Sequence, residues 1–135
     1  MTMKLRVVSS KKEIDDLNRN EQLIHLAFRA SNTDLFRLLQ ACPRLRAIQV
    51  PSSYYKTMSR AGQMFLEMQG VDIIEGDVWG HRKDIDEYYT VDDKVLDRIH
   101  DLQSEGMTVE DISGRISRET KLSPGLVKYV SRQAS

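Results

Sequence analysis

The chain has 135 residues, 40% of them apolar and 30% charged, and its twenty basic and twenty acidic residues cancel. These values suit one ordinary globular domain, or a small domain with a short helical appendage, and exclude a disordered or fibrous chain. Because the net charge is zero, an electrostatic partner must be bound by a local patch of charge and not by the molecule as a whole.

The sequence shows no sign of export or of a membrane span. The N-terminus, MTMKLRVVSSKK, lacks the apolar region of a signal peptide. The longest uncharged run, AIQVPSSYY at 47–55, is far shorter than the roughly 20 residues that a transmembrane helix needs. Cys42 is the only cysteine, which excludes an internal disulfide and fits a reducing compartment. We therefore predict a cytoplasmic protein with no membrane partner.

Four short apolar runs predict buried β-strands. They span 5–9, 23–28, 45–50 and 71–75. The stretches between them have helical patterns and are long enough for a helix and two loops, which favours right-handed β-α-β crossovers. The first part of the chain is therefore expected to form a small parallel four-stranded sheet of the α/β class.

Local signals mark the ends of the intervening helices. Ser10 and Ser31 each begin a capping box, in which a side chain three residues later completes the pattern. The third helix is predicted as one element that begins near Ser52 or Ser53 and ends at Gly70, a natural position for a residue with positive φ.

After residue 90 the strand patterns give way to three short amphipathic helices. Thr90 is expected to cap the first, which ends at Gly106; Thr108 caps the second, and Ser123 precedes the third. The segment GMTVEDISGRISRETKLSPGLVKYV is similar to a helix-turn-helix. The step from Ile116 to the last helix is, however, longer than in the compact bacterial motif.

The stretch EGDVWGHRKDIDEYY, at 75–89, joins the last predicted strand to these helices. Its side chains of the types that bind divalent metals are Asp77, His81, Asp84, Asp86 and Glu87. Their spacing does not place them on one helix face, because Gly76 and Gly80 argue against a helix. We therefore interpret the stretch as a connection, predict neither a metal nor a cofactor, and expect Trp79 to anchor it on the core.

Polar residues follow the predicted strands at the edge where open parallel sheets bind ligands. The candidate residues for an anionic small molecule are Arg29, Ser31, Asn32, Ser52, Ser53, Tyr54, Asp77 and His81. Arg29 would neutralise a phosphate or carboxylate while the serine hydroxyls donate hydrogen bonds. The alternative is that the serines only cap helices and Arg29 is solvated. No G-x-G-x-x-G or G-x-x-x-x-G-K-[ST] motif is present, so the usual phosphate cradles are not supported.

The sequence assigns no catalytic residue. His25 lies in LIHLAF, which is apolar on both sides, and is expected to be a buried structural residue, whereas His100 is expected to be exposed. No G-x-S-x-G nucleophile elbow is present. A small enzyme acting on a phosphorylated or carboxylated metabolite stays open as an alternative. The residues it would use are Arg29, Ser52, Asp77 and His81.

The C-terminal helices are locally basic. Residues 112–135 contain five basic residues and one acidic residue, a net charge of +4. The candidate contacts to nucleic acid are Arg118, Lys121, Lys128 and Arg132. Lys128 and Arg132 stand four residues apart on the last helix and could reach phosphates together. The alternatives are that these helices bind a protein, or that they only cap the sheet and have a solvated basic face.

Several stretches resemble one protein family. They are KLRVVSSKKEI, HLAFRASNTDLF, CPRLRAIQVPSSYYKTMS, FLEMQGVDIIEGDVWGHRKDIDEYY and SRETKLSP. The family consists of uncharacterised proteins, a domain of unknown function from methanogenic archaea, and the resemblance covers nearly the full length. It implies a cytoplasmic archaeal setting but no established activity, cofactor or catalytic residue.

The leading hypothesis is a non-enzymatic regulatory or binding protein with three parts: a sheet domain at 1–79, a connection at 80–91 and a helical segment at 92–135. The sheet would bind an anionic small molecule at its strand ends, and the helical segment would contact nucleic acid or a protein. Repositioning of the helices would link the two events. A structural homodimer is a further alternative, because a net charge near zero does not oppose self-association.

Overall fold

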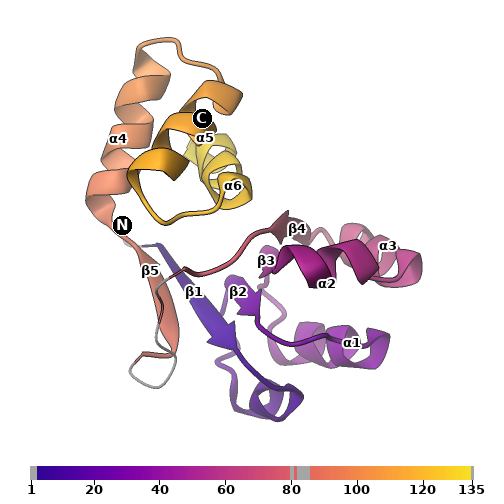
Figure 1. Ribbon diagram of the computed structural model, residues 1–135. Coiled ribbons are helices and arrows are strands. Elements are labelled where there is room, and N and C mark those ends of the chain that lie inside the picture. The colour runs from indigo at the N-terminus through magenta and orange to yellow at the C-terminus, as the bar shows by residue number, and fades with distance from the viewer. Residues whose placement is uncertain (1–2, 80, 82–85, 135) are drawn as a thin grey trace.

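One mostly parallel sheet forms the centre of the molecule (Figure 1). In the computed structural model, which describes residues 3–79, 81 and 86–134, five strands pair in the order β4-β3-β2-β1-β5. They are β1 (Met3–Val8), β2 (Leu23–Leu26), β3 (Ala47–Val50), β4 (Asp72–Glu75) and β5 (Tyr88–Val91). The first four strands are parallel, and β5 runs antiparallel to β1. The predicted α/β class is confirmed.

Strand β5 was not predicted, because its four residues lie within the stretch 80–91 that the sequence indicated as a connection. Tyr88, Tyr89 and Val91 are residue types that favour strands, but a run of four flanked by carboxylates gives a weak pattern. The strand forms because β1 offers it an edge, where Leu5 pairs with Tyr89 and Met3 with Val91. The prediction of four strands is therefore corrected to five among the described residues.

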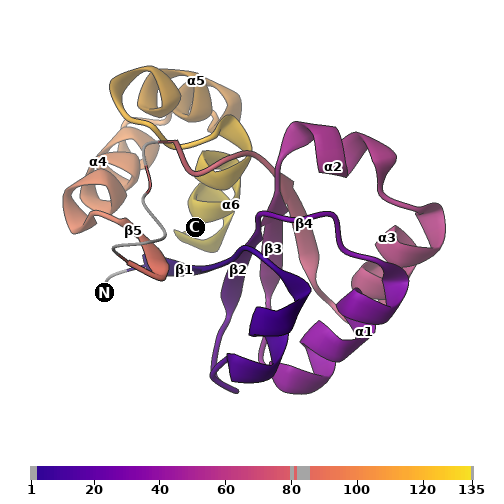
Figure 2. The ribbon, with the colours of Figure 1, turned by 60° about the horizontal axis from the view of Figure 1, so that its bottom comes forward.

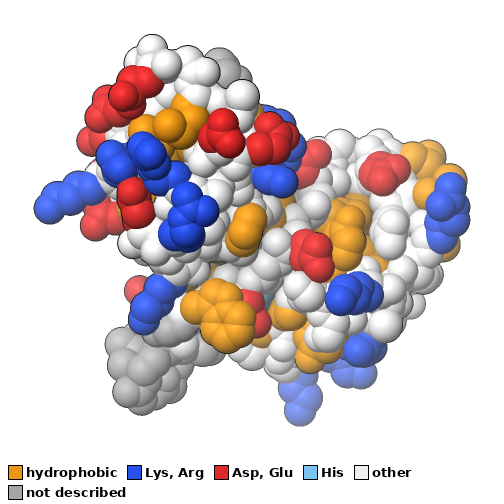
Figure 3. Space-filling model, turned by 45° about the horizontal axis from the view of Figure 1, so that its top comes forward, with side chains coloured by type: hydrophobic (Ala, Val, Ile, Leu, Met, Phe, Trp, Pro, Cys, Tyr) orange, Lys and Arg blue, Asp and Glu red, His pale blue; other side chains and the backbone are white. Residues whose placement is uncertain are grey.

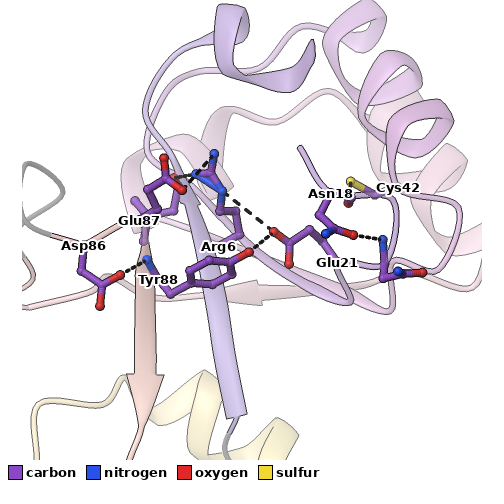
Figure 4. Close-up of polar contacts among 9 residues, drawn as sticks. Arg6, Asn18, Glu21, Cys42, Asp86, Glu87 and Tyr88 are labelled. Carbon is purple, nitrogen blue, oxygen red and sulfur yellow. Dashed lines mark hydrogen bonds and ion pairs between the residues drawn. The ribbon is translucent and has the colours of Figure 1, made fainter. Parts of the chain in front are cut away.

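A buried arginine helps to hold this added strand in place (Figure 4). Arg6, on β1, is 5% exposed, and its guanidinium lies 3.9 Å from a carboxylate oxygen of Glu21 and 3.8 Å from one of Glu87. The Tyr88 hydroxyl donates a 2.7 Å hydrogen bond to Glu21, and this bond with burial raises the pKa of Tyr88 to about 12. The cluster thus links β1, β5 and the loop before β2.

Helices cover both faces of the sheet (Figure 2). The segments between the parallel strands are the 3-10 helix η1 (Lys11–Asp16), α1 (Asn32–Ala41), α2 (Ser52–Thr57) and α3 (Arg60–Met68). The C-terminal helices are α4 (Asp93–Ser104), α5 (Val109–Glu119) and α6 (Pro124–Ala134). Ile48 packs with η1, α1 and α3, whereas its neighbour Ala47 packs with α4, α5 and α6, because successive residues of a strand point to opposite faces.

Most predicted helix ends are found, and the exceptions have local causes. Ser31 forms the predicted capping box with Asp34, and Gly70 and Gly106 have φ of 76° and 84°. The third predicted helix is interrupted after Thr57, because Met58 is extended and the Ser59 hydroxyl caps α3 anew.

Two further helix starts differ from the sequence prediction. The element after Ser10 is a 3-10 helix, and the Ser10 side chain forms no capping hydrogen bond there. Asp92 replaces Thr90 as the cap of α4, since Thr90 pairs with Lys4 in the sheet.

The first turn of α6 meets the end of β4 at unusually short range. A Cβ atom added to Gly125 would lie 2.7 Å from the carbonyl oxygen of Glu75, and one added to Gly76 would lie 2.2 Å from the Ser123 hydroxyl oxygen. Both positions therefore require glycine, because a side chain would push helix and strand apart. We call this place, formed by Glu75, Gly76, Ser123 and Gly125, the docking contact.

Gly125→Ala tests how tightly this contact is built. We expect the free energy of unfolding to fall by about 1–3 kcal/mol, because the added methyl group meets backbone atoms that cannot rotate away. Gly114→Ala is the matched control: its Cβ would meet nothing closer than Arg118 at 3.6 Å, so the same change inside α5 should stabilise by up to about 1 kcal/mol. Urea unfolding measures both, and equal effects would contradict the close approach.

Candidate functional site

A wide cleft of about 1080 Å³ opens where the strand ends meet the turn between α5 and α6. The sheet side contributes Ser52, Ser53, Glu75, Asp77 and Trp79, and the helical side contributes Ser117, Thr120, Lys121, Ser123 and Lys128. Figure 3 shows the surface on this side of the molecule, with basic and acidic side chains intermixed over the helical part. Both signs of charge line the cleft, and apolar surface makes up the larger part of its wall.

This cleft brings together residues that the sequence assigned to two separate sites. Ser52, Ser53 and Asp77 were candidates for binding an anionic small molecule, whereas Lys121 and Lys128 were candidates for nucleic acid. They become neighbours because α6 docks on the end of β4, a contact that joins segments far apart in the sequence. The strand ends and the helix-turn-helix-like segment therefore share one site.

Four of the other predicted rim residues line a smaller hollow of about 340 Å³; they are Arg29, Ser31, Asn32 and Tyr54. The guanidinium of Arg29 lies 4.9 Å from the centre of the Tyr54 ring and donates a hydrogen bond to the Thr57 hydroxyl. Ser31 caps α1, and Asn32 Oδ1 accepts a 2.9 Å hydrogen bond from Ser59. Each of these side chains thus already has a partner within the protein.

Besides forming β5, the stretch after β4 differs from its prediction at Trp79. Trp79 is 64% exposed and lines the cleft, so the expectation that it anchors the connection on the core was wrong. His81 lines neither hollow: its ring meets the ring of Tyr89 edge-on at 5.8 Å. Asp84 lies outside the described residues, and the described part of the chain contains no group of three or more metal-ligand side chains.

The residues of the enzyme hypothesis are not gathered in one place. Ser52 and Asp77 line the large cleft, Arg29 lines the smaller hollow, and His81 packs beside Tyr89. The Cys42 thiol is not an activated nucleophile either. It is fully buried, and burial raises the pKa of its thiol to about 11, while its Sγ lies 3.5 Å from the carbonyl oxygen of Asn18 (Figure 4).

Beneath the cleft, a buried chain of hydrogen bonds runs from the helices into the sheet. The Ser123 hydroxyl donates to Gln49 Oε1 at 2.9 Å, and Gln49 Nε2 donates to His25 Nδ1 at 3.0 Å. His25 Nε2 then faces the Asp77 carboxylate at 3.7 Å, beyond hydrogen-bond reach. Ser123, Gln49 and His25 are all buried. We call these three residues the buried relay.

The relay is neutral at neutral pH. Burial lowers the pKa of His25 from 6.5 to about 4, although the Asp77 carboxylate opposes the shift. The Ser123 hydroxyl makes two hydrogen bonds: it donates to Gln49 and, as the cap of α6, accepts from the Leu126 backbone N–H. The relay therefore serves to position α6 on the sheet and has no activated nucleophile.

Gln49 was not singled out in the sequence, and Ser123 was noted only as the residue that precedes the last helix. A signal was available, since His25 and Gln49 are polar residues inside short apolar strands and pair directly across β2 and β3. Two such residues on one buried face need a polar partner. What the sequence could not supply was its identity, because Ser123 is 74 residues away from Gln49.

The five basic residues of 112–135 lie in three places. Arg115 and Arg118, on α5, are exposed, whereas Lys121 and Lys128 line the cleft, with Lys128 half-buried. Arg132 is exposed and has a partner of its own. In a helix-turn-helix the start of the second helix normally contacts base edges. Here that start, at Ser123 and Gly125, faces the sheet.

The helical segment and the sheet domain each match a known family model. The model described as a C-terminal HTH domain, from a protein of unknown function (DUF1699), matches residues 94–132, which places this part of the chain in the helix-turn-helix class. The model of the N-terminal domain of the same family matches residues 4–87. The chain therefore belongs to the DUF1699 family, whose function is unknown.

These matches confirm the resemblance to an uncharacterised family and the helix-turn-helix character of the C-terminal helices. Comparison with curated proteins and with solved structures gave no match. Among the helices that the structure describes, none has the length and apolar character needed to cross a bilayer.

The buried relay predicts an acid-sensitive fold. His25 stays neutral in the folded protein down to about pH 4, whereas the unfolded chain takes up this proton below about pH 6.5. Stability contributed by the neutral ring is therefore present above pH 6.5 and is lost as the pH falls toward 4, by about 3 kcal/mol over the window. Urea unfolding across this range measures the loss.

His25→Asn should flatten this part of the pH profile, because Asn Oδ1 can accept from Gln49 without titrating. The control is His100→Asn, since His100 is exposed on α4 and should leave the wild-type profile unchanged. An identical acid slope in wild type and His25→Asn would show that the ring is not kept neutral by burial.

Proposed function

We propose that the protein is a non-enzymatic regulator that binds nucleic acid through its C-terminal helix-turn-helix domain and an anionic small molecule in the cleft beside it. The observation that carries the proposal is the position of the cleft. Residues of the strand ends and basic residues of the helix-turn-helix line it together, so a ligand there contacts both parts of the protein.

Nucleic-acid binding is supported by the domain class and by the distribution of charge. Arg115 and Arg118 project from α5 as exposed cations and can neutralise phosphates without any movement of the domain. The exposed Glu119 does not cancel them entirely, because it forms a bidentate ion pair with Arg98, at 2.7 and 2.8 Å.

The start of α6 can contact base edges only if the docking contact opens. The first turn of α6 is packed on β4 and fixed by the relay, so it cannot enter a major groove while docked. We infer that the docked arrangement is the form with low affinity for nucleic acid. Movement of α4, α5 and α6 away from the sheet would expose the start of α6 and raise the affinity.

The first test is salt dependence. Fluorescence anisotropy of a labelled duplex, titrated with the full chain at several salt concentrations, should give a slope of log K against log salt of about −3 to −4. Arg115→Gln with Arg118→Gln should weaken binding and reduce the slope by about 2, since two phosphate contacts are lost.

Lys11→Gln with Lys12→Gln is the matched control for charge. Both lysines are exposed on η1, which packs on the opposite face of the sheet, so the slope should stay at its wild-type value. Binding that is insensitive to salt, or an equal loss in both double variants, would exclude phosphate contacts by α5.

The second test weakens the docking contact without changing the helix-turn-helix. Gln49→Met keeps the length of the side chain but removes both of its hydrogen bonds, to Ser123 and to His25. Only the bond to Ser123 crosses the docking contact, and its loss costs roughly 1 kcal/mol or more, whereas the bond to His25 joins β3 to β2 within the sheet. The open form should therefore become more populated, and duplex affinity should rise roughly three- to tenfold.

Ile48→Val controls for general loss of stability. Ile48 lies next to Gln49 on β3 but points to the α1 side of the sheet, so its truncation should destabilise without affecting duplex affinity. If Gln49→Met binds duplex no better than the wild type, the docked form is not the low-affinity form.

A further inference from the structure

We propose that the cleft binds a mononucleotide, with its phosphate at Lys121 and Lys128 and its base against Trp79. This inference rests on the proposed function, because it names the anionic ligand of the same cleft. The charges and side chains that line the cleft suit a nucleotide better than a simple anion.

The helical side of the cleft supplies the positive charge. Lys121 is exposed in the turn after α5, and Lys128 is half-buried one turn into α6. Thr120 and Ser117 line the same side, but the Thr120 hydroxyl already donates a 2.8 Å hydrogen bond to the Ile116 carbonyl oxygen. The Ser117 hydroxyl oxygen is buried and has no hydrogen-bond partner among the described residues. Two ammonium groups beside the Ser117 hydroxyl suit a phosphate group.

The sheet side of the cleft supplies negative charge. Glu75 and Asp77 face the cleft, so two carboxylates accompany the two lysines and the charge of the lining cancels. A bare anion therefore gains little from the cleft as a whole. Carboxylates accept hydrogen bonds, and the hydroxyls of a sugar and the amino group of a base donate them. The ligand that fits carries a phosphate at one end and such donors at the other.

Trp79 indicates an aromatic ring in that ligand. It is the only tryptophan of the chain, and it is 64% exposed where it lines the cleft, which leaves a large aromatic face open to a ligand. Stacking against a nucleobase would cover the indole face, and such stacking tolerates any base. The cleft volume of about 1080 Å³ is near the upper end for ligand pockets and is large enough for a nucleotide.

Trp79 also reports on the site. We would titrate the full-length protein with AMP, ribose 5-phosphate and inorganic phosphate, following tryptophan fluorescence and, in parallel, heat by calorimetry. AMP should bind and change the fluorescence, ribose 5-phosphate should bind roughly tenfold more weakly, and inorganic phosphate weaker still. Lys121→Gln and Lys128→Gln should each lower AMP affinity roughly tenfold.

Two variants complete the design. Trp79→Leu should weaken AMP, measured by calorimetry, but leave ribose 5-phosphate unchanged. Lys94→Gln, an exposed lysine of α4 outside the cleft, should change nothing. Equal affinity for AMP and inorganic phosphate would overturn the nucleotide inference while leaving an anion site. Failure of all three ligands to bind would overturn the small-molecule part of the proposed function too, whereas duplex binding is judged by its own titration.

Discussion

The contact between the first turn of α6 and the ends of β3 and β4 is the constraint on which the rest of the structure depends. Gly76 and Gly125 allow backbone and helix to meet at a distance that excludes a side chain, and Ser123 continues the contact into the sheet through Gln49. The buried Gln49 amide needs a polar partner, and Ser123 supplies one only while α6 is docked, so the relay favours one position of the helix. The helical domain thus docks in a defined way.

Two functional consequences follow from this docking. The cleft is formed by the strand ends and the α5–α6 turn together. A ligand bound in it would contact both, and its affinity would depend on whether the helical domain is docked. The same contact covers the part of α6 that a helix-turn-helix uses to read base sequence. In the proposed function, ligand binding and nucleic-acid binding would be linked through this one contact, and each would change the other by shifting the population of the docked form.

The sequence predicted what depends on local pattern. The parallel strands, the capping box of Ser31 and the helix ends at Gly70 and Gly106 follow from periodicity and from residues with special conformations. It failed where tertiary context decides. β5 needs the free edge of β1, and the partnership of Gln49 with Ser123 joins residues that no local rule connects. The candidate residues of the site were thus named in part, but their division between two hollows required the fold.

The most direct measurement is the NMR signal of the Gln49 side-chain amide in the free protein and in the presence of saturating duplex. In the docked form Nε2 donates to His25 within the core, so its protons should exchange slowly with water. The duplex should shift this signal and accelerate its exchange, because α6 leaves the sheet when it binds. An unchanged, protected amide in the complex would show that nucleic acid binds the docked form, and would contradict the account.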